Sequence, residues 1–165
     1  MSDDRAETRC GFVALIGAPN AGKSTLINRL VGTKVSIVSR KVQTTRTIVR
    51  GIAMIERSQV VFVDTPGIFQ PRRRLDRAMV ETAWGGARDA DIVALLIDVG
   101  RGLDDEVREI LAKLGDIAQK KILLLNKIDL VPREKLLALA AEANGAASFE
   151  RTFMISALSG DGLDD

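Results

Sequence analysis

The chain has 165 residues, of which 46% are hydrophobic and 28% are charged, and its formal net charge is +2. This length suits one domain with its own core, and the charge is too small for a nucleic-acid-binding face, so we expect no DNA binding. The sequence contains no histidine, which excludes Ser/His/Asp triads and the usual histidine-containing zinc sites. A lone Cys10 cannot form an internal disulfide, which favours a reducing compartment.

Residues 1–10 are polar, contain no apolar stretch behind a basic start, and are expected to be flexible. No later apolar run approaches the roughly eighteen residues of a membrane span. We therefore expect a cytoplasmic protein whose single domain occupies residues 11–165.

Short apolar runs recur along the chain with helix-like segments between them, which predicts βαβ units and a mostly parallel sheet. Nearly continuous apolar runs indicate strands that are covered on both faces, and they occupy residues 12–16, 60–63, 92–97 and 121–125. The mixed segment 47–57 indicates an edge strand antiparallel to its neighbour, and residues 149–155 indicate a weaker sixth strand.

Helix signals follow most of these strands, beginning with residues 23–31 directly behind a glycine-rich loop. In residues 75–88 apolar side chains recur at a spacing of three to four, which predicts a helix with one buried face, formed by Leu75, Met79, Val80 and Ala83.

Two further helices have recognisable ends. Asp104 or Asp105 is expected to cap a helix that continues to residue 114. Pro132 is placed to start a helix through residue 143, which ends near Asn144 and Gly145.

These elements predict a three-layer α/β fold with a mostly parallel six-stranded sheet and one antiparallel edge strand. Residues 160–165 are typical of the cap and first residues of a covering helix. We therefore expect the sequence to be a piece of a longer protein, truncated where its last helix begins.

The segment Gly17-Ala18-Pro19-Asn20-Ala21-Gly22-Lys23-Ser24, followed by Thr25, fits the phosphate-loop pattern G-x-x-x-x-G-K-S/T between a predicted strand and a predicted helix. Glycines in this pattern allow successive backbone amides to face the phosphates, and the helix behind them adds its positive end. We expect Lys23 to contact the β and γ phosphates and the Ser24 hydroxyl to bind Mg²⁺.

The segment Asp64-Thr65-Pro66-Gly67 follows the strand predicted at residues 60–63. A carboxylate at Asp64 can reach the metal through water, and the Gly67 amide can meet the γ phosphate. Its position one strand after a phosphate loop favours this reading over an ordinary solvent-facing turn.

The segment Asn126-Lys127-Ile128-Asp129 also follows an apolar strand, and it indicates the base that is bound. The Asp129 carboxylate can accept from N1–H and the 2-amino group of guanine, whereas adenine offers neither donor. Asn126 is expected to tie this loop to the phosphate loop, and the stem of Lys127 to lie along the base. Farther along, the Ala157 amide can donate to guanine O6, and Ser156 can brace Asp129.

These four motifs, in this order, resemble those of the translation-factor-related GTPases with a Ras-like phosphate-loop fold. Residues 39–46 are similar to the first switch of the bacterial Era GTPases, and residues 66–68 and 73–79 resemble their second switch. The resemblance implies Mg²⁺-dependent GTP hydrolysis, with GTP and GDP as ligands.

In these GTPases a threonine of the first switch contributes to Mg²⁺ and γ-phosphate binding, and this role maps to Thr45, with Thr44 as the alternative. At the corresponding position of the first switch, tRNA-modification GTPases and double-domain ribosome-assembly GTPases typically show Gly-x-Thr-Arg-Asp. The chain instead has Gln-Thr-Thr-Arg-Thr at residues 43–47, which favours the Era family.

One departure from the Ras pattern bears on hydrolysis. Ile68 occupies the place of the glutamine that orients the attacking water. Asn20 matches a phosphate-loop asparagine that in relatives helps to hold K⁺, and with Lys23, Thr45 and Gly67 it completes the expected catalytic set.

The resemblance also implies partners outside these residues. Era proteins carry a C-terminal KH domain that binds 16S ribosomal RNA and assists assembly of the small ribosomal subunit, and no KH signature is present here. Peripheral association with the inner face of the membrane is a further expectation. The alternatives are a different ribosome-assembly or tRNA-modification GTPase, an ATP-dependent kinase, and a nucleotide-binding module without catalysis.

Overall fold

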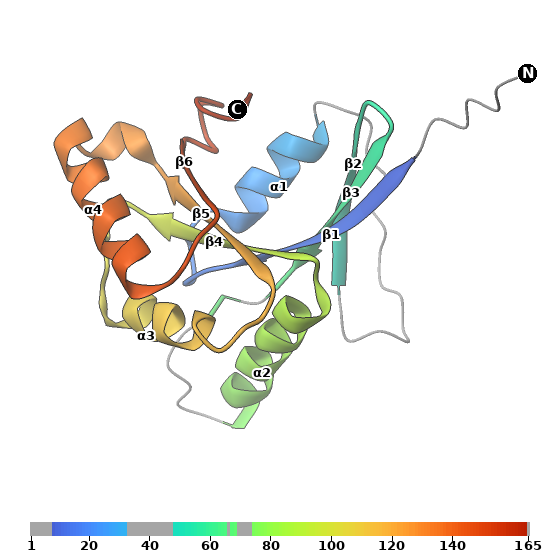
Figure 1. Cartoon of the computed structure of the whole chain (residues 1–165), viewed down its shortest axis with the longest axis horizontal. Helices are drawn as coiled ribbons and strands as arrows, with labels where there is room; N and C mark the ends of the chain where they lie inside the picture. Colours follow the sequence, from blue (N-terminus) through green and yellow to red (C-terminus); the bar gives the residue numbers. More distant parts are fainter. Residues whose placement is uncertain (1–7, 33–47, 66, 69–73, 165) are drawn as a thin grey trace, which may run out of the picture.

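A six-stranded sheet runs through the middle of the molecule, with helices on both of its faces (Figure 1). The computed structural model describes residues 8–32, 48–65, 67–68 and 74–164. The strands are β1 Arg9–Ile16, β2 Ile48–Ile55, β3 Ser58–Asp64, β4 Ile92–Asp98, β5 Lys120–Asn126 and β6 Arg151–Ile155. The helices are α1 Lys23–Gly32, α2 Arg74–Asp89, α3 Asp105–Leu114 and α4 Arg133–Ala146, with a 3-10 turn η1 at Ile128–Leu130.

The strand order is β2-β3-β1-β4-β5-β6, and β2 alone runs antiparallel to its neighbour. Helix α1 packs on one face with the apolar side chains of β1, β4 and β5, while α2, α3 and α4 contribute to the core on the other face. The expected three-layer fold with one antiparallel edge strand is therefore confirmed. Because β1, β3, β4, β5 and β6 are parallel, the loops that follow them meet at one edge of the sheet.

Several element ends differ from the expectations. Strand β1 begins at Arg9, two residues before the expected start of the domain, because its backbone pairs with β3 from Ser58 onward. Strand β2 stops at Ile55, since Glu56 has a left-handed backbone (φ 53°) and turns the chain into β3.

Helix α4 passes through Asn144 and Gly145, where its end was expected, and stops at Ala146. The Asn144 amide group donates to Ala140 O within the helix and to Thr152 on β6, which lets a residue typical of a helix end stay inside. At the N-terminus of α3, the Asp104 carboxylate accepts the Val107 amide, so Asp104 is the capping residue.

The apolar face of α2 is shifted from the expected one. Leu75 is 72% exposed and Met79 is 38% exposed, whereas Val80 and Ala83 are buried together with Trp84. The first turn of α2 points away from the sheet, and the helix reaches the core only from its second turn onward (Figure 1).

Residues 157–159 and 161–162 form turns, and no helix begins among the described residues 157–164. Gly160 and Gly162 adopt left-handed backbones (φ 94° and 72°). Within the part of the chain that the structure describes, no helix has the length and apolar character needed to cross a bilayer.

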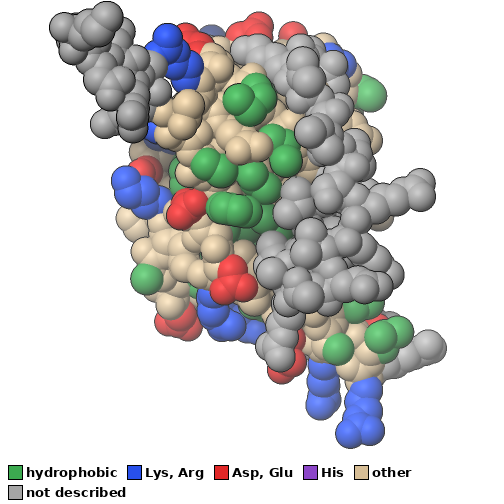
Figure 2. All heavy atoms as spheres, turned by 90° about the vertical axis from the view of Figure 1, so that its right-hand side faces the viewer, with side chains coloured by type: hydrophobic (Ala, Val, Ile, Leu, Met, Phe, Trp, Pro, Cys, Tyr) green, Lys and Arg blue, Asp and Glu red, His purple; other side chains and the backbone are tan. Residues whose placement is uncertain are grey.

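Figure 2 shows hydrophobic side chains gathered on one side of the molecule. The strands β1, β2 and β3 lie on this side, and among the side chains described on them the exposed large hydrophobic ones are Phe12, Met54 and Ile55. Cys10, also on β1, is an exposed free thiol.

Candidate functional site

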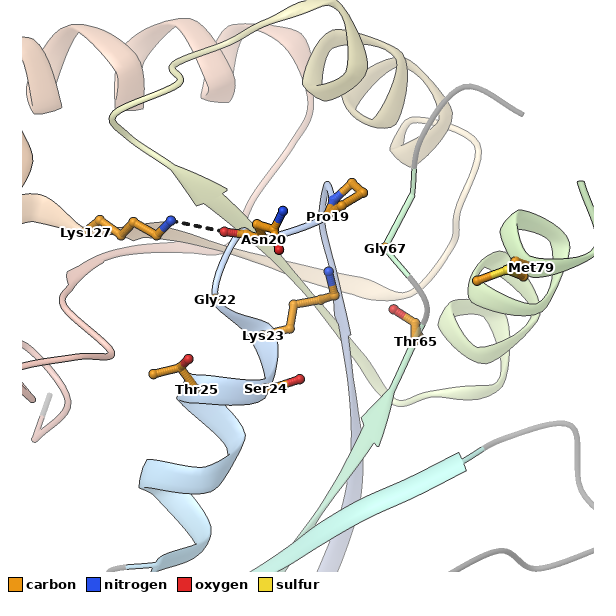
Figure 3. A pocket seen from close by; sticks show the side chains of 10 residues that line it. All are labelled: Pro19, Asn20, Gly22, Lys23, Ser24, Thr25, Thr65, Gly67, Met79 and Lys127. Carbon is orange, nitrogen blue, oxygen red and sulfur yellow. Dashed lines mark hydrogen bonds between the residues drawn. The ribbon is translucent and has the colours of Figure 1, made fainter. Parts of the chain in front are cut away.

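A cleft of about 580 Å³ opens at the edge of the sheet where the parallel strands end. Its lining comes from the loop after β1, the start of α1, the segment after β3, α2 and the loop after β5 (Figure 3). These residues are Pro19, Asn20, Gly22, Lys23, Ser24, Thr25, Thr65, Gly67, Met79 and Lys127.

The glycines of the loop after β1 are required by close packing. A Cβ atom on Gly17 would lie 2.6 Å from Leu96 O, and one on Gly22 would lie 2.4 Å from the Asn126 Nδ2 atom. Gly22 also has a left-handed backbone (φ 105°), which costs glycine little. The turn that the phosphate-loop motif predicts is therefore present, and α1 starts directly behind it.

Lys23 is buried inside this loop, with 8% of its surface exposed. Its ammonium donates to Ala18 O at 3.1 Å and to Gly17 O at 3.3 Å. The positive charge thus lies at the centre of the loop, where a phosphate chain would be bound.

The segment after β3 packs directly against the phosphate loop. The Thr65 hydroxyl donates to Leu15 O at 2.5 Å, and the Ile68 amide donates to Gly17 O at 2.8 Å. A Cβ atom on Gly67 would lie 2.9 Å from the Pro19 Cα atom, so only glycine fits. The two motifs are brought together as the sequence predicts.

Ser24 is the one predicted metal ligand whose side chain the structure describes, and it is exposed in the cleft. The Asp64 side chain, Thr44 and Thr45 lie outside the described residues. Mg²⁺ commonly takes one or two protein ligands and completes its coordination with substrate phosphates and water, so the Ser24 hydroxyl beside the cleft fits such an ion.

A second pocket of about 320 Å³ continues the cleft, with which it shares Gly22, Thr25 and Lys127. Its remaining lining residues come from the end of β5 and from the segments after β5 and β6: Asn126, Asp129, Leu130, Ala157 and Leu158. Asp129 is exposed within η1, directly beside this pocket. The lining includes the expected Asn126, Lys127, Asp129 and Ala157 but not Ser156, and it adds two leucines that were not expected.

Asn126 connects three loops from a fully buried position, with 1% exposure. Its Nδ2 donates to Ala21 O at 2.9 Å, and its Oδ1 accepts the Ala157 amide at 2.9 Å. The Arg29 Nε atom on α1 donates to Ala157 O at 2.9 Å. The expected connection between Asn126 and the phosphate loop is present, and Asn126 also connects to Ala157 in the segment after β6.

Ser156 is buried, and its hydroxyl oxygen accepts the Ser159 amide at 3.2 Å, so it stabilises its own turn. Its expected contact with Asp129 stays a prediction. Lys127 has a left-handed backbone (φ 66°), and its ammonium donates to Asn20 O at 3.0 Å (Figure 3). The same ammonium donates to Asp98 Oδ2 at 2.6 Å.

Asp98 and Arg101 belong to the site and were missed in the sequence. Asp98 ends β4 at the same edge as the motifs, and this position was the signal that could have identified it. Arg101 donates to Pro19 O at 3.4 Å and pairs with Asp104 at 2.6 Å. A hydrogen bond with Glu106, aided by the charge of Asp104, raises the pKa of Arg101 above its ordinary value.

Ile68, which replaces the Ras glutamine, has 6% exposure and packs in the core with Val80, Trp84 and Ile110. Its side chain therefore faces away from the nucleotide cleft and cannot orient water there.

The fold and the site together define a Ras-like phosphate-loop domain whose cleft continues into a second pocket. A model of the family described as "50S ribosome-binding GTPase" matches residues 12–127. The chain belongs to this family.

The chain is 69% identical over 160 residues to the GTPase Era of Bradyrhizobium sp. (strain BTAi1 / ATCC BAA-1182), covering 97% of this chain and 52% of that protein. It is also 69% identical over 158 residues to the GTPase Era of Sinorhizobium medicae (strain WSM419), covering 96% of this chain and 51% of that protein. A crystal structure of Era in complex with MgGDPNP and nucleotides 1506–1542 of 16S ribosomal RNA has a TM-score of 0.80 and 38% identity, covering 96% of this chain and 54% of that one. The resemblance to the Era GTPases is thus confirmed, and the chain spans about half the length of these curated relatives.

Proposed function

We propose that this chain binds GTP and GDP together with Mg²⁺ and hydrolyses GTP, as the GTP-binding part of a protein resembling Era. The observation that carries the proposal is the continuity of the two pockets. One end holds the buried Lys23 ammonium, and the other holds the Asp129 carboxylate and the Ala157 amide. A triphosphate and a guanine base need these groups at opposite ends of one site.

Selection of guanine follows from donors and acceptors at the base end. Asp129 accepts from the N1–H and 2-amino groups of guanine. The Ala157 amide donates to Asn126 Oδ1 in the structure, so its donation to guanine O6 requires this bond to break or to be shared when the base binds. Arg29 holds the carbonyl of the same residue. A site that pairs such groups rejects an analogue lacking them by roughly 10⁴ to 10⁵.

At the phosphate end, Lys23 neutralises the β and γ phosphates, and the Gly67 amide donates to the γ phosphate. The Ser24 hydroxyl holds Mg²⁺, with Asp64 and Thr45 as its further predicted partners. The bound ion supplies charge neutralisation at the phosphates when present.

Because Ile68 is buried in the core, it cannot orient the attacking water as the Ras glutamine does. Hydrolysis also needs a group that compensates the charge developing between the β and γ phosphates. Among the described residues that line the cleft, the cations are Lys23 and Lys127, and there is no arginine. Asn20 is exposed there with a left-handed backbone (φ 63°) and offers an amide oxygen. We assign Asn20 to a K⁺ site, and the cation supplies the neutralisation that an arginine finger otherwise gives.

The wider role rests on the relatives. They are about twice as long as this chain, and one solved Era structure contains 16S ribosomal RNA. We propose that the full-length protein binds this RNA through a C-terminal KH domain during assembly of the small ribosomal subunit. Peripheral membrane contact stays a prediction.

The test measures phosphate release from GTP and from ATP at equal concentrations, in K⁺, Na⁺ and Cs⁺ at constant ionic strength. We expect phosphate release from GTP only, at a higher rate in K⁺ than in Na⁺ or Cs⁺. In the Asn20→Ala variant the rate should no longer depend on K⁺. Comparable turnover of ATP would support the kinase alternative. Tight GTP binding without turnover would support a module without catalysis. Equal rates in K⁺ and Na⁺ would refute the cation mechanism while leaving the GTPase assignment intact.

A further inference from the structure

Two successive carbonyl groups of the phosphate loop are held by cations that come from other loops. Arg101 donates to Pro19 O, and Lys127 donates to Asn20 O. A peptide unit whose carbonyl is held on one side presents its amide on the other. These contacts therefore favour the arrangement in which loop amides face a bound phosphate.

The lysine is itself held by an acid. Asp98 Oδ2 accepts the Lys127 ammonium at 2.6 Å, while Asp98 Oδ1 accepts the Gly100 amide at 2.9 Å. The Asp98 side chain is 13% exposed and that of Lys127 is 34% exposed, so the pair is partly shielded from water. A charge-assisted hydrogen bond in such surroundings is roughly twice as strong as one between neutral groups.

Two residues joined by this network have unusual backbones. Asn20 and Lys127 are both left-handed, with φ of 63° and 66°, although neither is glycine. Such conformations persist only where neighbouring contacts over-determine them. The bond between Lys127 Nζ and Asn20 O ties these two positions together, and Asp98 orients the ammonium that forms it.

We propose that Asp98 is a positioning residue for guanine-nucleotide binding. Its carboxylate holds the Lys127 ammonium against Asn20 O, so that the stem of Lys127 stays along the wall of the base pocket and the phosphate loop keeps its shape. Without this carboxylate, the long side chain regains rotamer freedom that the nucleotide must then restrict. The inference rests on the proposed function, because it concerns the same nucleotide site.

The informative variant is Asp98→Asn. Asparagine keeps an Oδ1 acceptor for the Gly100 amide but presents an NH₂ donor to the Lys127 ammonium in place of a carboxylate oxygen. If Asp98 only stabilised its own turn, this variant would behave like the wild type. If Asp98 positions Lys127, dissociation of fluorescently labelled GDP accelerates by about 10-fold to 100-fold, the range expected for a lost hydrogen bond to a charged group.

The Lys127→Ala variant tests whether Asp98 acts through Lys127. We expect Asp98→Asn to have no additional effect on GDP dissociation in the Lys127→Ala background, because the residue that it positions is gone. Glu142→Gln is the matched control, since it removes an exposed carboxylate that pairs with Arg108 at 2.6 Å away from the site, and it should leave GDP dissociation unchanged.

Wild-type dissociation rates for Asp98→Asn would overturn the inference, as would a full effect of Asp98→Asn in the Lys127→Ala background. Weak binding of GDP by the wild type would instead contradict the proposed function, so the two failures are distinguishable.

Discussion

Replacing Asn126 by alanine tests whether one buried amide holds the nucleotide site together. The variant removes the bonds to Ala21 O and from the Ala157 amide, both of which belong to residues with 2% exposure. Each buried polar group left without a partner costs about 1 to 3 kcal/mol, so the free energy of unfolding should fall by about 2 to 6 kcal/mol. At about 2 to 4 °C per kcal/mol for a domain of this size, a loss near the middle of that range lowers Tm by about 8 to 16 °C.

The assay is thermal unfolding followed by circular dichroism, with and without saturating Mg²⁺ and GDP. Asn144→Ala is the matched control, because Asn144 also makes two side-chain hydrogen bonds, to Ala140 O and Thr152, but in an exposed place. Its stability should stay within about 0.5 kcal/mol of the wild type. GDP should raise the Tm of Asn126→Ala less than that of the wild type, since the Ala157 amide is no longer fixed. Equal losses of Tm in the two variants would refute this reasoning.

Two further substitutions test the base and phosphate ends of the pocket separately. Asp129→Asn should shift preference from guanine toward xanthine nucleotides, because an amide can donate where xanthine offers an acceptor. Competition between XDP and GDP for the site measures this preference. An unchanged preference for GDP would contradict the base assignment. Gly67→Ala should slow single-turnover GTP hydrolysis by about 100-fold while sparing GDP affinity, because a Cβ atom 2.9 Å from the Pro19 Cα pushes the Gly67 amide away from the γ phosphate. Equal weakening of GDP and GTP binding would show instead that the whole loop is disturbed.

Much of the site could be predicted because its motifs are contiguous and each follows an apolar strand. The pattern from Gly17 to Ser24 specifies a loop almost completely, and parallel strand order then brings Asp129 and Ala157 to the same edge. The boundaries of β2 and α4 were less predictable. They depend on single contacts, such as the bonds from Asn144 to Ala140 and Thr152, which override the turn preference of the residue.

The supporting residues could not be predicted in the same way, because their partners are distant in sequence. Asp98 reaches Lys127 across 29 positions, and Arg101 reaches Pro19 across 82. The exposure of Leu75 and Met79 was missed for a related reason. Helical spacing identifies which side chains share a face, but where that face stops meeting the sheet depends on how α2 is placed against β1 and β4.

The described loops of the site are connected to one another by hydrogen bonds within the protein. The Ile68 amide joins the segment after β3 to Gly17, while Asn126 joins the loops after β1, β5 and β6. Ile68 also anchors this arrangement to α2 and α3 through its buried side chain. Because the same residue links the Gly67 segment to the core, a change at the γ phosphate that shifts Gly67 must also disturb the packing around Trp84.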